Sequence, residues 1–158
     1  MMADASACVL RLTILSDPKH IRIMRGALLQ VASLAGFSDH DAQQMTLAVD
    51  EGCTNIIKYS YDGDCTRKIV LSCYVVPGGI EIRIRDFGKK SSPDQIKSRR
   101  LSDVRPGGLG VHLMHEIMDV VEYNHSKKVG TELRLVKRIK DRPNKGDPTR
   151  SEPPGPHS

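Results

Sequence analysis

The sequence predicts an α+β fold, a two-layer α/β sandwich with helices on one face of a mixed, mostly antiparallel sheet. Segments with apolar residues at every second position are interspersed with segments of helical spacing, in the order strand, helix, helix, strand, strand, long loop, helix, strand. Pro77-Gly78-Gly79 joins two strands in an antiparallel hairpin. The core has to be aliphatic, because Trp is absent and aromatic residues make up only 4% of the chain.

Length and composition indicate one domain, at residues 1–139, followed by a basic, proline-rich tail at 140–158 that we expect to be flexible. The chain has 158 residues, of which 39% are hydrophobic and 27% charged, as in ordinary globular proteins. Its apolar runs are shorter than the ~18 residues of a membrane span, and its N-terminus does not resemble a signal peptide. We therefore expect a cytoplasmic protein without a membrane partner.

Residues 8–15 and the segment after them predict a strand and a helix. The strand alternates, and its predicted buried face carries Cys8, Leu10, Leu12 and Ile14. Asp17 is a candidate N-cap and Pro18 suits the first helical position. Apolar residues at helical spacing follow, and Gly36 is placed to end the helix.

A second helix, over residues 41–61, carries the first candidate site. Ser38, three residues before Asp41, resembles the start of a capping box. The apolar stripe of this helix consists of Met45, Ala48, Val49, Gly52 and Ile56. Glu51 and Asn55 are one turn apart along the edge of that stripe. Such a pair most often caps a neighbour or faces water, so alone it does not indicate chemistry.

The second half of the chain predicts a hairpin, a long loop, a helix and a last strand. Residues 67–76 and 80–85 alternate as strands with one wet face, and the second strand ends in Asp86-Phe87-Gly88. Residues 89–106 form a polar loop, which at this length is either functional or disordered. A helix then opens at the glycines of 107–110. Residues 120–123 either continue that helix or begin another strand, and 131–138 form the last strand.

Cysteine spacing and charge exclude several classes of protein. Cys8, Cys53, Cys65 and Cys73 show no C-x-x-C spacing, and three lie in apolar patterns, which favours buried free thiols over a zinc site. The net charge is +5, with basic residues concentrated in the long loop and the tail. Nucleic acid is one partner for such patches. Because no recognition helix, zinc finger or aromatic stacking pattern accompanies them, we expect a solvated surface or an acidic protein partner instead.

Three features in sequence order point to a nucleotide. Glycines ahead of a helix let phosphate approach the backbone, whose free N–H groups bind anions. Asp86 at a strand end can accept a hydrogen bond from an exocyclic amine such as that of adenine, and Gly88 lets a flat ring come close. Asn55 offers a neutral oxygen to Mg²⁺, and Glu51 can accept a proton from an attacking hydroxyl. The fingerprints of P-loop and Rossmann proteins are absent from the sequence.

The ordered combination resembles the Bergerat-fold (GHKL) ATPases, and among them the anti-sigma factor serine kinases. The stretch Glu51-Gly-Cys-Thr-Asn55-Ile-Ile-Lys-Tyr-Ser-Tyr61 resembles their N-box, Asp86-Phe-Gly88 their first glycine box and Arg105-Pro-Gly-Gly-Leu-Gly110 their second. Gly130-Thr131 resembles the start of their last strand. Three positions depart from the family pattern: Tyr59 where His is common, Gly52 where Ala is usual, and Lys90 where a second glycine is expected.

The resemblance implies ATP and Mg²⁺ as cofactors and a role for each matching residue. Glu51 would be the general base and Asn55 the Mg²⁺ ligand. Asp86 would bind the adenine amine, supported by Gly88 and Thr131. The second glycine box would contact the phosphates, and Arg105 would reach the terminal phosphate or the partner. Its implied nucleotide-binding residues are Arg105, Gly107, Gly108, Leu109 and Gly110.

The resemblance also implies a kinase that phosphorylates an anti-anti-sigma protein on Ser or Thr and sequesters a sigma factor, with no direct binding of nucleic acid. The exposed strands allow a homodimer. An alternative is a nucleotide-gated protein that sequesters its partner without phosphorylating it, although an intact Glu51 speaks against that. The catalytic half of a histidine kinase lacks support, because the chain shows no helix with a phospho-accepting His, and a DNA-binding regulator rests on charge alone.

Overall fold

The computed structural model describes residues 6–90 and 109–140 of the chain. Most of the predicted 89–106 loop lies outside the described residues, as do Arg105, Gly107 and Gly108 and nearly all of the predicted tail. The division into a domain and a tail at residue 139 therefore stays a prediction. In the described part of the chain, no helix is long and apolar enough to cross a membrane.

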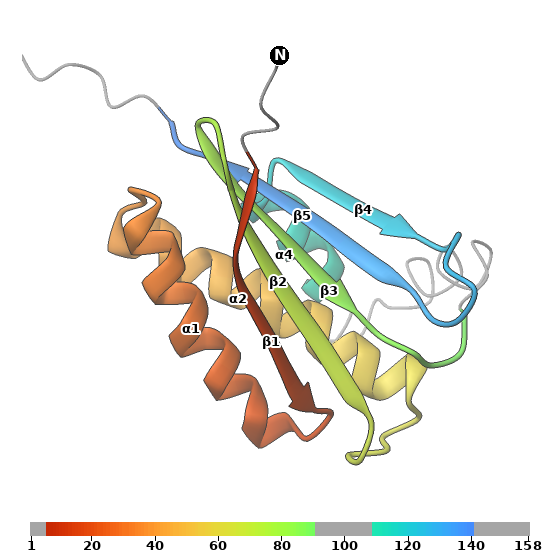
Figure 1. Cartoon of the computed structure of the whole chain (residues 1–158). Coiled ribbons are helices and arrows are strands. Elements are labelled where there is room, and N and C mark those ends of the chain that lie inside the picture. Colours follow the sequence, from red (N-terminus) through yellow and green to blue (C-terminus); the bar gives the residue numbers. More distant parts are fainter. Residues whose placement is uncertain (1–5, 91–108, 141–158) are drawn as a thin grey trace, which may run out of the picture.

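Five strands form one sheet in the order β1-β2-β3-β5-β4 (Figure 1). Their bounds are Ala7–Leu15 (β1), Lys68–Val76 (β2), Gly79–Arg85 (β3), Val120–Asn124 (β4) and Glu132–Arg138 (β5). Every pairing between these described strands is antiparallel. This confirms the mostly antiparallel character that the sequence predicts, whereas the prediction of a mixed sheet is wrong for the described strands. The open question at residues 120–123 is answered in favour of a strand.

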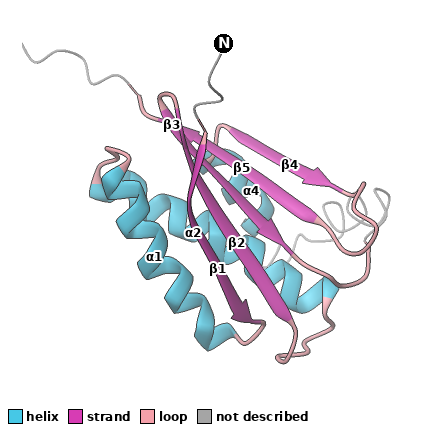
Figure 2. Cartoon of the chain, in the orientation of Figure 1, coloured by secondary structure: helices cyan, strands magenta, loops and turns pink. Residues whose placement is uncertain are grey.

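The helices lie on one face of this sheet, as Figure 2 shows, so the predicted two-layer α+β architecture is confirmed. Their bounds are Ile21–Leu34 (α1), Asp39–Asn55 (α2) and Leu109–Ile117 (α4). The helix α2 packs against both α1 and α4. Its last turn widens into a π-helical turn, Ile56–Ser60.

Local signals in the sequence start and end these helices as predicted. Asp17 caps a 3-10 turn that precedes α1, accepting a hydrogen bond of 3.0 Å from Lys19 N, and Pro18 is its first residue. Gly36 follows α1 with a φ of +94°, a conformation that glycine adopts without strain. Ser38 Oγ accepts a hydrogen bond of 3.2 Å from Asp41 N and so caps α2.

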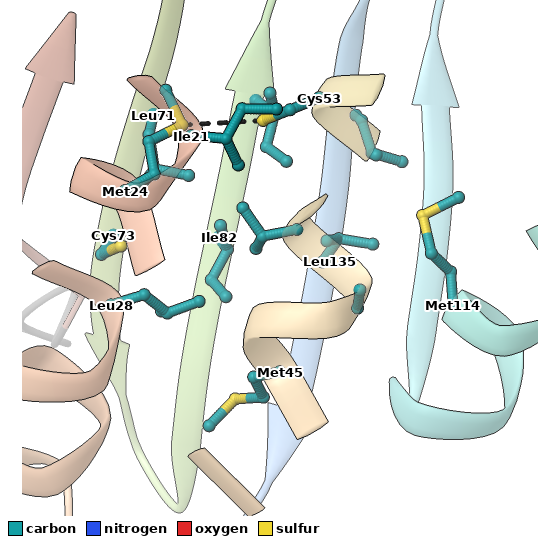
Figure 3. Close-up of a cluster of buried hydrophobic side chains, with 14 of the residues drawn as sticks. Ile21, Met24, Leu28, Met45, Cys53, Leu71, Cys73, Ile82, Met114 and Leu135 are labelled. Atoms are coloured by element: carbon teal, nitrogen blue, oxygen red, sulfur yellow. Dashed lines mark hydrogen bonds between the residues drawn. The ribbon is translucent and has the colours of Figure 1, made fainter. Parts of the chain in front are cut away.

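The core fills the space between the helices and the sheet, and it is aliphatic and sulfur-rich (Figure 3). Met24 of α1 meets Cys53 of α2, with their sulfurs 3.6 Å apart. Leu28 of α1 is buried in the same cluster, together with residues of the central strands. At Gly52 a β-carbon would stand 2.9 Å from Leu133 Cδ2. Because glycine has no side chain, α2 can approach the sheet closely at this position.

The prediction that Cys8 is buried is wrong, whereas Cys53 and Cys73 are buried as predicted. The pairing register of β1 with β2 shifts between Cys8 and Leu10, so that Cys8 pairs with Tyr74 and Leu10 with Cys73. Such a β-bulge interrupts the alternation of a strand. Cys8 is therefore out of phase with the apolar face and is exposed.

The predicted wet face of the hairpin is only partly wet. Glu81 alternates with the core residues of β3 and so lies on the face away from the helices, yet it is only 8% exposed. Arg83 Nε lies 2.5 Å from Glu81 Oε1, and Arg134 Nη2 lies 3.0 Å from Glu81 Oε2. The long side chains of Arg83 and Arg134 shield the Glu81 carboxylate from solvent. The alternation of residues along a strand does not predict this kind of burial.

Candidate functional site

The helix α2 presents Glu51 and Asn55 at the edge of its buried stripe, as the spacing predicts. Met45, Ala48, Val49, Gly52 and Ile56 are all buried, while Glu51 and Asn55 are half-buried. Among the residues that the structure describes, neither side chain makes a hydrogen bond or an ion pair.

The start of α4 lies directly against Glu51. Gly110 is the second residue of this helix, and a β-carbon there would overlap the Glu51 carboxylate. The glycine therefore permits the two helices to meet at this point. The first turn of a helix also carries free backbone N–H groups and a partial positive charge, which favour an anion.

The other end of the site is Asp86, directly after β3. Its side chain is only 3% exposed, and Oδ1 accepts a hydrogen bond of 3.0 Å from Gly88 N. Burial raises the pKa of this carboxyl, and the bond from Gly88 N opposes the rise. Asp86 N donates to Thr131 O at 3.0 Å. Gly130, with a φ of +71°, packs on the Asp86 carbonyl.

The π-helical turn after Asn55 connects the part of the site at Glu51 and Asn55 with the part at Asp86. Ser60 O accepts a hydrogen bond of 3.2 Å from Lys89 N. A β-carbon at Gly88 would overlap Ser60 O, so the backbone of Ser60 requires a glycine at that position. π-Helical turns of this kind are frequent at functional sites. The helix that carries Glu51 and Asn55 thus also contacts the segment that carries Asp86.

The structure brings the predicted residues together in two groups along α2. Asp86, Gly88 and Thr131 meet where β3 ends and β5 begins, and Gly110 meets Glu51. Asn55 lies one turn beyond Glu51, toward the π-helical turn. Leu109 is the first residue of α4, but its side chain lies outside the described part of the chain, as do the remaining predicted residues of the second glycine box.

Sequence reasoning missed the structural roles of Ser60, Tyr61 and Gly130 beside Asp86. Ser60 and Tyr61 are the last residues of the stretch that resembles the N-box, and Gly130 directly precedes a predicted site residue. These positions next to predicted site residues were the only signal in the sequence that could have indicated the roles of these three residues. Of the three departures, Tyr59 is exposed and Lys90 donates from Nζ to His125 O at 2.9 Å, across to the β4–β5 connection. Gly52 serves the close packing of α2 on the sheet.

A hollow lies next to β4 and β5, and one of its lining residues, His125, has its Nδ1 3.5 Å from Thr131 Oγ1. None of the predicted site residues lines it. Its lining residues are Arg83, Glu122, Tyr123, Asn124, His125, Ser126, Lys127, Glu132 and Arg134.

Comparison with known proteins defines the class. Residues 14–137 match the model of the histidine kinase-like ATPase domain, and the chain therefore belongs to that family. It is similar to proteins named serine-protein kinase RsbW. The one from Bacillus licheniformis is 32% identical over 67% of this chain and 71% of its own length, and the one from Bacillus velezensis is 27% identical over 80% and 84%. The resemblance predicted from the sequence is thereby confirmed.

Two solved structures share the fold. One holds the RsbU and RsbW domains of Rv1364c from Mycobacterium tuberculosis, with a TM-score of 0.60 and 18% identity; the match covers 82% of this chain and 31% of that longer one. The other is the SiaB-SiaC complex from Pseudomonas aeruginosa, with a TM-score of 0.60, 12% identity and coverage of 84% and 90%. At these identities the likeness concerns the fold alone.

Proposed function

We propose that this protein is an ATP- and Mg²⁺-dependent serine/threonine protein kinase and anti-sigma factor, which phosphorylates an anti-anti-sigma protein and sequesters a sigma factor. Family membership and the similarity to serine-protein kinases support the proposal. The proposed setting is the cytoplasm. The edge strands β1 and β4 leave room for a homodimer.

The observation that carries the proposal is that one helix, α2, carries one group of polar side chains and leads to the segment that carries another. Glu51 and Asn55 expose oxygens one turn apart beside Gly110, and the same helix leads to the segment that carries the buried Asp86. This donor set fits Mg-ATP. A neutral carboxamide oxygen suits Mg²⁺, a glycine at a helix start suits phosphate, and a buried carboxylate suits a neutral amine donor.

Each residue then has one task. Asn55 would ligate Mg²⁺ and Glu51 would accept the proton of the attacking hydroxyl. Asp86, held by Gly88 N and supported by Thr131, would accept a hydrogen bond from the adenine amine. Gly110 would contact the phosphates together with Gly107, Gly108, Leu109 and Arg105. Mg-ATP, when bound, supplies the phosphoryl group, whose transfer depends mainly on positioning and charge neutralisation.

The first test is thermal unfolding of the protein with and without Mg-ATP, beside the variant Asp86→Ala. A ligand at 100 times its Kd adds about 2.7 kcal/mol to the free energy of unfolding. We expect a clear rise in Tm for the natural sequence and none for Asp86→Ala. The absence of a shift at millimolar Mg-ATP in the natural protein would overturn the nucleotide site.

The second test separates a kinase from a protein that only sequesters its partner. Candidate anti-anti-sigma proteins are incubated with γ-labelled ATP and either the natural protein or Glu51→Ala. We expect transfer to a Ser or Thr that Glu51→Ala abolishes while ATP binding persists. Binding of ATP without any transfer by the natural protein would favour the sequestering function.

A further inference from the structure

Tyr61 is the first residue after the π-helical turn of α2, and its hydroxyl is committed to two main-chain groups. The residue is 4% exposed. The hydroxyl donates a hydrogen bond of 2.6 Å to Lys68 O at the start of β2. It accepts a second bond of 2.9 Å from Phe87 N, directly after Asp86. The side chain thus connects the end of the π-helical turn with the start of β2 and with the segment that follows β3.

The backbone of residues 86–89 is held from several sides. Thr131 O binds the N–H of Asp86, and Ser60 O binds that of Lys89. The N–H of Phe87, between these two residues, donates to the Tyr61 hydroxyl. Two of these three hydrogen bonds are therefore made by the consecutive residues Ser60 and Tyr61, at the end of the π-helical turn.

Arg67 contacts both the Tyr61 ring and the main chain of Phe87. Its guanidinium lies over the Tyr61 ring, 4.8 Å from the ring centroid, and its Nη2 donates to Phe87 O at 2.9 Å. Cation–π contact and hydrogen bond therefore restrain the tyrosine ring and the same peptide segment together. The main-chain N–H of Phe87 is thus bonded to Tyr61, and its main-chain carbonyl is bonded to Arg67.

We infer that Tyr61 is a positioning residue of the nucleotide site, whose hydroxyl fixes Asp86 relative to Glu51 and Asn55 by tying Phe87 N to the end of α2. The inference rests on the proposed function and deepens it. The phosphate end of a bound ATP would lie at the last turns of α2, and its adenine end would lie at the segment that contacts the π-helical turn. Tyr61 would keep the spacing between these two places constant. Tyr61 would not touch the reacting atoms.

Loss of the hydroxyl should affect the adenine end only. In Tyr61→Phe the ring remains, but Phe87 N and Lys68 O lose their partner in a buried place. Asp86 would then sample other positions, and the affinity for Mg-ATP should fall roughly tenfold. Because Glu51, Asn55 and Gly110 stay in place, kcat at saturating ATP should be unchanged while KM rises.

The control is Ser72→Ala. Ser72 is 7% exposed, and its hydroxyl accepts a hydrogen bond of 3.2 Å from Arg11 Nε. Both residues belong to the paired strands β1 and β2, and neither belongs to residues 60–67 or 86–89. This variant should lower Tm and leave the Kd of Mg-ATP unchanged.

The deciding measurement is the ratio of the Kd values for Mg-GTP and Mg-ATP, by calorimetry, on the full chain. Adenine offers an amine to Asp86 where guanine carries a carbonyl oxygen, so a displaced Asp86 discriminates less between them. We expect the ratio to fall several-fold in Tyr61→Phe and to stay constant in Ser72→Ala. An unchanged ratio in Tyr61→Phe, or an equal fall in both variants, would overturn the role of Tyr61.

A second variant keeps the test open if Tyr61→Phe does not fold. Arg67→Met removes the bond to Phe87 O and the contact with the tyrosine ring, and it should change the same ratio in the same direction by a smaller factor. Nucleotide binding by the natural protein with a constant ratio in both variants overturns the role of Tyr61 alone. Failure of the natural protein to bind Mg-ATP overturns the proposed function and, with it, this inference.

Discussion

The carboxylate of Glu51 packs against the Cα of Gly110, so that a β-carbon at residue 110 would lie 2.5 Å from Glu51 Cδ. The two residues belong to α2 and to the first turn of α4. The position of the proposed general base therefore depends on a glycine that is distant in the sequence. A side chain at residue 110 has to displace Glu51, α4 or both.

Gly110→Ala should therefore reduce phosphoryl transfer, by roughly 10²-fold or more, because it moves the proposed base. The measurement is the transfer rate to the substrate protein at saturating Mg-ATP, with Tm recorded beside it. Gly26→Ala is the control, because a β-carbon at this position in α1 meets nothing within 4 Å. That variant should leave transfer unchanged and raise the free energy of unfolding by about 0.5–1 kcal/mol. A transfer rate in Gly110→Ala equal to that of the natural protein would contradict the proposed role of this contact.

The cap of α2 should contribute measurably to stability. Ser38→Ala removes the acceptor of Asp41 N, and the free energy of unfolding in urea should fall by about 1 kcal/mol. Ser33→Ala is a suitable control, because Ser33 is an exposed residue of α1, where alanine is the better helix former. Equal stability of the two variants would mean that the Ser38 bond adds nothing in solution.

Patterns that are local in sequence predicted most of the fold. Periodicity identified the helices and the hairpin, and capping residues identified their ends, because both depend on neighbours within a few positions. The exposure of Cys8 was missed, since a β-bulge depends on the partner strand and not on the strand itself. The burial of Glu81 was missed for a similar reason, because Arg134 reaches it from β5.

The site was predictable to the extent that its residues form motifs. Spacing and the family resemblance predict Glu51, Asn55 and Asp86 as candidate site residues, and their roles stay a prediction. The bond from Phe87 N to the Tyr61 hydroxyl joins residues 26 positions apart, and no local pattern encodes it. A polar residue at the end of a motif is a candidate for such a link, but only the folded chain shows its partner.

The four cysteines should differ sharply in reactivity. Cys8 and Cys65 are exposed, whereas burial raises the pKa of the Cys53 and Cys73 thiols to about 12. Because the thiolate is the reactive form, iodoacetamide at pH 8 should label two cysteines of the native protein and all four after denaturation. Peptide mass spectrometry would identify the sites. Rapid native labelling of Cys53 or Cys73 would contradict the buried positions of these side chains.

Glu81 should make the protein sensitive to acid. Burial disfavours the charged carboxylate, but hydrogen bonds from Arg134 and Arg83 outweigh that cost and lower the pKa of Glu81 in the folded state. A carboxyl with a lowered pKa contributes stability that is fully present above its unfolded pKa of about 4.3. That contribution is lost as the pH falls through the folded value. Stability should therefore decline below about pH 4.5 in part through this group.

The measurement is urea unfolding of the natural protein and Glu81→Gln between pH 7 and pH 3. Glu81→Gln should lose about 1–3 kcal/mol at pH 7, where two charge-assisted bonds are weakened, and the difference should shrink toward pH 3. Glu122→Gln is the control, because Glu122 also pairs with Arg134 but its side chain is 62% exposed; its effect should stay within about 0.5 kcal/mol. If the gap between Glu81→Gln and the natural protein were the same at both ends of this range, the protonation of Glu81 would not contribute to acid unfolding.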